Sequence, residues 1–163
     1  MAPFSDLTDK IVAYAAAGPG FDMDESIDWA IEQLQLGHET PHLLMLAGMS
    51  KPVNYFETAP YLAQALKELH LEEKTGEDAI ISFCRYYIKK IAQADDVPGN
   101  LKRLYSFYYL FDQDHLIQDF VYLYWGWGDL EYDSAQYYWP GATTENIEGL
   151  VVERAVLWLE ENK

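Results

Sequence analysis

Two short strings in the chain match the spacing of metal-binding motifs. His38-Glu39-Thr40-Pro41-His42 fits the pattern H-E-x-x-H, in which two histidines one helical turn apart bind zinc beside a catalytic glutamate. That chemistry requires a continuous helix, and Pro41 inside a helix would remove a hydrogen bond and clash with the preceding turn. We therefore expect a helix to begin at Thr40, with His38 outside it, and we predict no metal site.

The second string, residues 22–26, resembles the start of an EF-hand calcium loop. Its sixth position must be glycine and is Ile27, and its twelfth should be glutamate and is Gln33. An acidic first helical turn explains the string better, because carboxylates are favoured at a helix N-terminus. The chain also lacks the phosphate-loop, dinucleotide-binding and nucleophile-elbow motifs, so we predict no cofactor and no catalytic residues.

The unusual region of the chain is an aromatic segment, residues 105–139. Trp125 and Trp127 differ by two positions, so a single narrow helix face cannot hold both. Two arrangements stay open: helices buried on all sides, which the usual role of aromatic residues in cores favours, or rings that reach solvent. The aromatic residues of the segment are Tyr105, Phe107, Tyr108, Tyr109, Phe111, Phe120, Tyr122, Tyr124, Trp125, Trp127, Tyr132, Tyr137, Tyr138 and Trp139.

The same region has no positive charge. The whole chain carries 11 basic and 27 acidic residues, a net charge of −16, which argues against a nucleic-acid ligand. Between Leu104 and Glu153 there are only acids, without a lysine or arginine. Aromatic rings beside uncompensated carboxylates are typical of an interface for a basic protein, in which rings anchor and carboxylates steer. A solvated acidic surface that serves solubility alone is an equal alternative.

We predict a non-enzymatic protein-interaction domain that binds a basic partner. The expected contact residues are Trp125, Trp127, Asp129, Glu131 and Asp133, with Trp127 and Asp129 foremost. The alternative is a carbohydrate-binding or glycosidase-like protein, in which rings stack on sugars and two carboxylates act as a pair. Its candidate pairs are Asp129 with Glu131, or Asp112 with Asp114.

Helical periodicity dominates the chain and predicts an all-α fold. The 163 residues are expected to form one domain, residues 1–163, of about seven or eight short helices packed as antiparallel hairpins. Only residues 130–139 suggest a short β-hairpin. The helices are expected at about 7–17, 24–36, 40–47, 58–69, 75–91, 100–111, 114–127 and 143–158, with Ser5, Asn100 and Asp114 among the expected N-caps.

Composition also indicates the core and the compartment. No apolar run is long enough to span a membrane, residues 1–10 do not resemble a secretory signal, and the lone Cys84 lies in an apolar stretch. These features predict a cytoplasmic protein with a buried, unreactive cysteine. The predicted core contains Ile31, Leu34, Leu66, Leu69, Phe83, Tyr87, Ile91, Leu104, Phe120, Leu123 and Trp158.

Five segments together carry a resemblance to a known kind of protein. They are Asp28-Trp29-Ala30, residues 43–48, Asn54-Tyr55-Phe56-Glu57, residues 119–125 and Tyr138-Trp139-Pro140-Gly141-Ala142. In these segments the chain is similar to small, acidic, all-helical bacterial cytosolic proteins without an assigned activity, some of which are immunity proteins of toxin systems. The resemblance implies a binding role and supplies no catalytic residue. An exposed aromatic area would also suit a homodimer.

Overall fold

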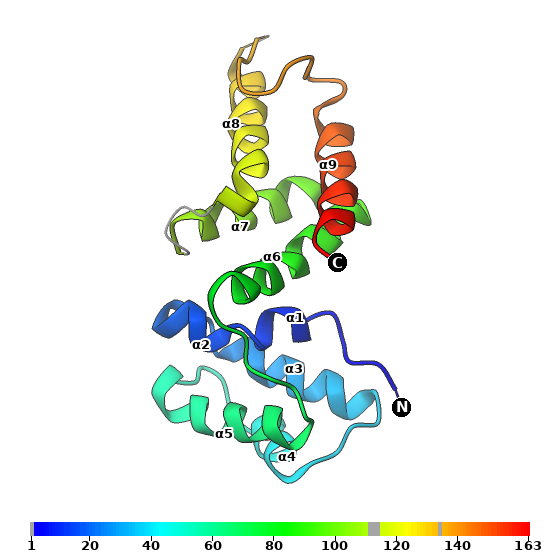
Figure 1. The fold of residues 1–163 in the computed structure, drawn as a ribbon. Coiled ribbons are helices and arrows are strands. Elements are labelled where there is room, and N and C mark those ends of the chain that lie inside the picture. Colours follow the sequence, from blue (N-terminus) through cyan, green and yellow to red (C-terminus); the bar gives the residue numbers. More distant parts are fainter. Residues whose placement is uncertain (1, 111–114, 134) are drawn as a thin grey trace. The chain divides into compact units, whose positions relative to one another are not determined.

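The computed structural model describes residues 2–110, 115–133 and 135–163, and every regular element in these ranges is a helix (Figure 1). The predicted all-α class is confirmed. The described residues form nine α-helices where about seven or eight were expected, because the first expected helix is divided into α1 (Thr8–Ile11) and α2 (Tyr14–Ala17). The short β-hairpin that residues 130–139 suggested as an exception to the all-α class is not formed, since α8 continues through Tyr132 and no strand follows in the described part.

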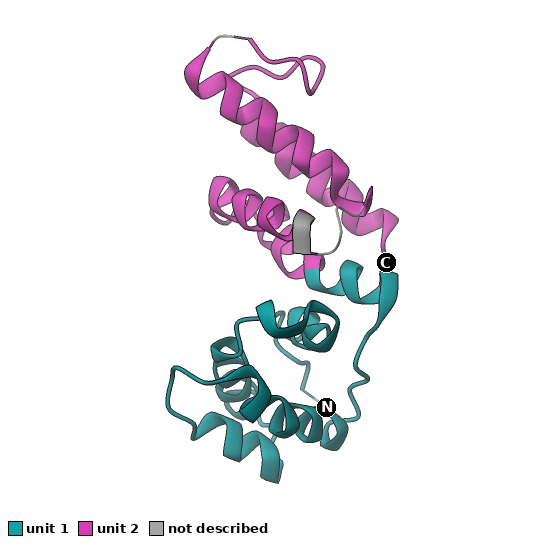
Figure 2. Cartoon of the chain, turned by 90° about the vertical axis from the view of Figure 1, so that its left-hand side faces the viewer, with its two compact units in different colours: residues 1–83 teal, residues 84–163 magenta. Residues whose placement is uncertain are grey.

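The described residues fall into two compact units, residues 1–83 and residues 84–163 (Figure 2). The boundary lies within α6 (Gly76–Ala92), between Phe83 and Cys84. Each unit has buried apolar side chains of its own, and each is described by itself below. The single domain that the sequence suggests stays a prediction.

Unit 1 contains α1 to α5 and the first part of α6. The predictions for α3 (Asp24–Gln35) and α4 (Pro41–Ala47) are confirmed, with Thr40 at the N-cap of α4 and Gly48 at its C-cap. The predicted start of α5 (Tyr55–Glu68) is three residues late. The Asn54 side chain accepts hydrogen bonds from the first turn and so starts the helix there, which leaves Pro60 inside α5.

The buried face of α3 differs from the predicted one. Trp29 is fully buried, and its indole N–H donates to Thr8 Oγ1 over 2.9 Å. Gln33 is also buried, and its amide bonds the backbone and the hydroxyl of Ser5. Because these polar contacts turn Trp29 and Gln33 inward, Ile31 stays 40% exposed and its predicted core position is wrong. Ser5 accordingly binds Gln33 with its side chain and does not cap α1.

The other predicted core positions are almost all buried. Leu34 and Leu69 are half-buried, at the edge of the core. Cys84 is buried, as expected for a small apolar side chain. The confirmed core residues are Leu66, Phe83, Tyr87, Ile91, Leu104, Phe120, Leu123 and Trp158.

Unit 2 contains the rest of α6, α7 (Val97–Leu110), the short 3-10 helix η2 (His115–Ile117), α8 (Gln118–Tyr132) and α9 (Ile147–Glu161). Helix α7 begins three residues before the expected cap Asn100, which is itself buried and donates to the Asp95 carbonyl over 2.7 Å. The expected cap Asp114 lies outside the described residues. Helices α8 and α9 run antiparallel and side by side, and α7 packs against both (Figure 1).

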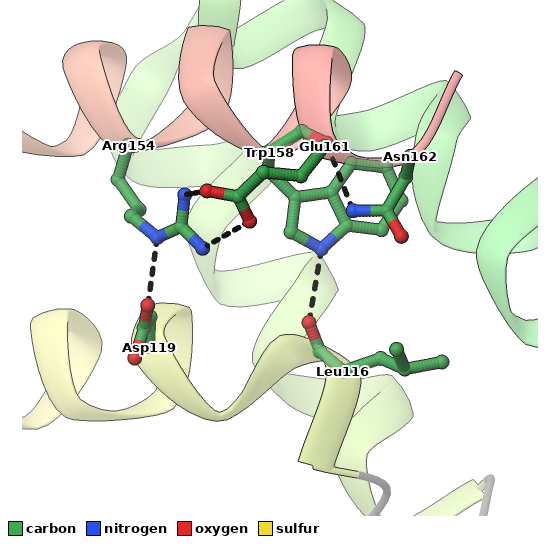
Figure 3. Close-up of polar contacts among 6 residues, drawn as sticks. All are labelled: Leu116, Asp119, Arg154, Trp158, Glu161 and Asn162. Carbon is green, nitrogen blue, oxygen red and sulfur yellow. Dashed lines mark hydrogen bonds and ion pairs between the residues drawn. The ribbon is translucent and has the colours of Figure 1, made fainter.

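Polar contacts tie α9 to the start of α8 (Figure 3). Arg154 Nε donates to Asp119 Oδ2 over 2.7 Å, and both terminal nitrogens of the guanidinium bind Glu161 at 3.0–3.1 Å. One turn further along α9, the buried indole of Trp158 donates to the Leu116 carbonyl over 2.9 Å. This carbonyl belongs to η2, so α9 fixes both the 3-10 turn and the helix that follows it.

Within the described residues, no helix has the length and apolar character needed to cross a membrane.

Trp158 provides a test of this packing. The substitution Trp158→Phe removes the hydrogen bond to Leu116 and leaves a void, so we expect it to lower the free energy of unfolding by about 2 kcal/mol. The matched control is Val156→Ala on the exposed side of α9, which should cost about 0.5 kcal/mol or less. Urea denaturation followed by far-UV circular dichroism measures both. Equal effects of the two substitutions would show that Trp158 does not hold α9 in place.

Candidate functional site

Unit 2 carries a pocket of about 610 Å³ between α7, the second half of α8 and the segment after α8. Most of its wall comes from α8. Helix α7 contributes its first turns, and Tyr138 comes from the segment after α8. The residues that line it are Pro98, Leu101, Lys102, Tyr124, Trp125, Trp127, Gly128, Asp129, Glu131, Tyr132 and Tyr138. We call it the aromatic pocket.

Gly128, which is half-buried, gives the α8 wall of the pocket a position without a side chain. On a helix of 3.6 residues per turn, Trp125 and Trp127 lie on opposite flanks of the position of Gly128. A Cβ atom built at Gly128 would find no heavy atom within 4 Å. Both indoles line the pocket, one on each side of Gly128 around the helix, although a narrow helix face could not hold both.

Contacts with neighbouring tyrosines hold the Trp125 side chain in place. Its indole N–H points to the Tyr105 hydroxyl at 3.4 Å, and the Tyr105 ring stacks on Tyr124, with centroids 4.2 Å apart and planes 15° from parallel. Tyr138 lies against the same indole, with a centroid separation of 5.5 Å. Trp127 lines the pocket, is half-buried, and makes no ring contact and no side-chain hydrogen bond within the described ranges.

Gln136 holds the segment after α8 in place. Its carboxamide oxygen accepts from the backbone N–H groups of Tyr138 and Trp139 at 2.9 and 2.8 Å, and its nitrogen donates to the carbonyls of Trp139 and Ala142. The same oxygen would lie 2.9 Å from a Cβ atom built on Gly126. Because Gly126 has no side chain, the segment closes onto α8 and brings Tyr138 to Trp125.

The charge of the pocket is mixed but mainly negative. Asp129 and Glu131 line it and are exposed, and neither carboxylate has an ion pair or hydrogen bond in the part of the chain that is described. Both lie in the last turns of α8, where the backbone carbonyls add partial negative charge. Lys102, from α7, is the cation among the lining residues.

The aromatic segment of residues 105–139 is largely outside the core. Phe120 alone among its described rings is fully buried, so the burial that the composition favours is wrong for this region. Tyr132 and Tyr137 are each 92% exposed. The rings of Tyr109 and Phe111 lie outside the described side chains.

Four of the five predicted contact residues line the aromatic pocket, and Asp133 follows directly after α8 without lining it. Sequence reasoning gave no role to Gly128 and Gln136, which shape the pocket, or to Lys102. The spacing around Trp125 contained part of this information, since Gly128 and Tyr132 follow it at i+3 and i+7 on the same side of a helix.

The zinc-like string has the backbone that Pro41 predicts. Helix α3 ends in a Schellman motif, with Gly37 at a φ of 96° and His38 N–H bonded to the Gln33 carbonyl. His38 therefore precedes α4, and His42 lies within it with Nδ1 2.8 Å from Glu68 Oε2. No group of three metal-ligating side chains occurs within residues 2–110, 115–133 and 135–163.

The contact between His42 and Glu68 shifts the titration of the carboxylate. Partial burial raises the pKa of Glu68, but the hydrogen bonds from the His42 ring and the His42 N–H help to outweigh it and leave the pKa below its ordinary value. The pair fixes α4 against α5. The alternative carboxylate pair, Asp112 with Asp114, lies outside the described residues.

Comparison of the chain with protein-family models, with curated proteins and with solved structures gave no significant match.

The role of Gln136 can be tested by the hydrogen-exchange rates of individual backbone amides. Gln136→Ala removes the acceptor of the Tyr138 and Trp139 N–H groups, so we expect their hydrogen exchange to accelerate about five- to tenfold, the equivalent of one net hydrogen bond. The control Tyr137→Ala truncates a 92% exposed ring in the same segment and should leave both rates within about twofold. If Gln136→Ala leaves both rates unchanged, something other than Gln136 holds the segment.

Proposed function

We propose that this protein is a non-enzymatic interaction module and that the aromatic pocket of unit 2 is where it binds a basic protein partner. The observation that supports this most directly is the combination of accessible rings with unpaired carboxylates at one hollow. Trp127 lines the pocket, and Asp129 and Glu131 beside it have no partner within the described residues. Interfaces concentrate binding energy in such aromatic anchors.

Long-range electrostatics supports a basic partner. A net charge of −16 attracts cationic proteins from a distance and repels nucleic acids and anionic membrane surfaces. The attraction raises the association rate, while the aromatic pocket supplies the short-range contacts. In its most concrete form the partner is a toxin and this protein its cytoplasmic immunity protein, a form that rests on the resemblance described above.

A carbohydrate ligand has less support. Sugar sites combine stacking rings with several side chains that both donate and accept hydrogen bonds, and in the pocket lining only the hydroxyls of Tyr124, Tyr132 and Tyr138 can do both. The carboxylates of Asp129 and Glu131 are exposed, whereas a glycosidase needs a shielded carboxyl with a raised pKa to act as its acid. We keep a carbohydrate ligand as an outcome that the experiments below can reveal.

Affinity capture from the native cell lysate tests the proposal. The bait is the full chain, compared with Trp127→Ala and Asp129→Asn in the pocket and with Glu153→Gln, an exposed acid of α9, as the matched control for charge. We expect a basic protein that the parent and the control recover equally and that each pocket variant recovers about tenfold less. With the partner purified, its affinity should fall as salt rises, because salt screens the steering charges.

Two results would contradict the proposal. Equal recovery of every captured protein by parent and pocket variants would remove the aromatic pocket from the interaction. A chain that sediments as a dimer, and whose Trp127→Ala variant sediments as a monomer, would show that the surface binds a second copy of the chain instead.

A further inference from the structure

We infer that the aromatic pocket receives an arginine side chain, so that the partner's recognition element is a single exposed arginine on a basic surface. This inference rests on the proposed function and adds the chemical group that the pocket selects. The aromatic rings, the two carboxylates and the charge of Lys102 support it.

The rings offer flat surfaces already held at the right place. Trp125 is fixed by Tyr105 and Tyr138, so a ligand that stacks on it meets an ordered wall and orders little more of the protein. Trp127 lines the same pocket, and Gly128 next to it contributes no side chain to the lining. A guanidinium is planar and weakly hydrated, and it stacks on indole and phenol faces more readily than an ammonium does.

The carboxylates of the pocket can accept hydrogen bonds from the N–H groups at the edge of a guanidinium. Asp129 and Glu131 follow Gly128 in α8, one and three residues later, and lack partners in the described part of the chain. A guanidinium that stacks on a ring presents its N–H donors parallel to the ring plane, and carboxylates accept them in pairs. The last turns of α8 favour a cation at this end of the helix.

The positive charge of Lys102 distinguishes an arginine ligand from a sugar or an anionic ligand. It lines the pocket from α7, is exposed, and makes no side-chain hydrogen bond or ion pair within the described residues. A cationic ligand is repelled by Lys102, whereas a sugar or an anionic group would use its ammonium as a donor. Removal of this charge must therefore strengthen the binding of an arginine and weaken the binding of the other two classes.

The test uses N-acetyl-arginine amide, which carries one guanidinium and no other charge, on the full ¹⁵N-labelled chain. We expect a Kd on the order of 1 mM, read from the indole N–H signals of Trp125 and Trp127. The signals of Trp29 and Trp158 act as internal controls, because both indoles are buried and hydrogen-bonded. N-acetyl-citrulline amide has the same shape without the charge and should bind at least about tenfold more weakly.

A pocket-filling substitution supplies the matched comparison. Gly128→Leu adds a side chain to the pocket lining at a position where a Cβ atom meets no heavy atom within 4 Å, and Gly149→Leu makes the same change at an exposed position of α9 with the same free space. We expect Gly128→Leu to abolish binding of the arginine probe and Gly149→Leu to leave its Kd unchanged. Both replace a helical glycine, which favours the helix, so both proteins should fold.

Two charge variants are expected to change the affinity for the arginine probe in opposite directions. Lys102→Gln should tighten the binding of N-acetyl-arginine amide about two- to threefold, and Asp129→Asn should weaken it by a similar factor, because both positions are solvent-screened. Weaker binding by Lys102→Gln would overturn the inference.

The remaining outcomes separate this inference from the proposed function. If N-acetyl-lysine amide binds as tightly as the arginine probe, or if cellobiose shifts the Trp127 signal and the arginine probe does not, the selection of arginine is wrong. If the pocket variants lose a captured partner but no arginine binding is seen, the arginine inference fails and the interaction module stands. If the probe binds at the pocket and capture is the same for parent and variants, the proposed function fails.

Discussion

At Gly128 the wall that α8 gives to the pocket has no side chain, and the site depends on this. The helical repeat places Trp125 and Trp127 on either side of that position, and both indoles line the pocket although they cannot share a narrow face. A larger residue at 128 would add its side chain to this lining. The pocket thus combines one position without a side chain with neighbouring residues that are large.

Polar contacts behind the rings keep this pocket in one shape. Tyr105 fixes Trp125 and stacks on Tyr124, and Gln136 bonds four backbone groups of the segment that brings Tyr138 to the pocket. Gly126 allows the close approach of Gln136 to α8. At the other end of α8, Arg154 ties the helix to α9 (Figure 3). Trp125 is therefore positioned in the free protein, and a preformed wall of this kind lowers the entropy that binding of the proposed ligand must overcome.

The places where sequence reasoning succeeded and failed have identifiable causes. Pro41 and Gly37 act through their own backbones, and the local structure around them is as predicted, with His38 left outside α4. Asn54 and Gln33 act through side-chain contacts. Asn54 starts α5 earlier than the apolar pattern suggests, and Gln33 binds Ser5 on a distant segment and turns the buried face of α3 away from Ile31. Periodicity treats both residues only as polar, so their effect is not visible in it.

The sequence by itself determined that the fold is helical, where most of the helices lie, that residues 104–153 combine rings with acids, and that Trp127 and Asp129 belong to one candidate surface. These properties follow from residue types at short spacing along a helix, which is local information. Tertiary structure alone decided that the rings reach solvent, that Gly128 lines a pocket, and that Lys102 and Tyr138 join its wall. Those outcomes depend on how α7, α8 and the segment after α8 pack, and packing is set by contacts between residues far apart in the chain.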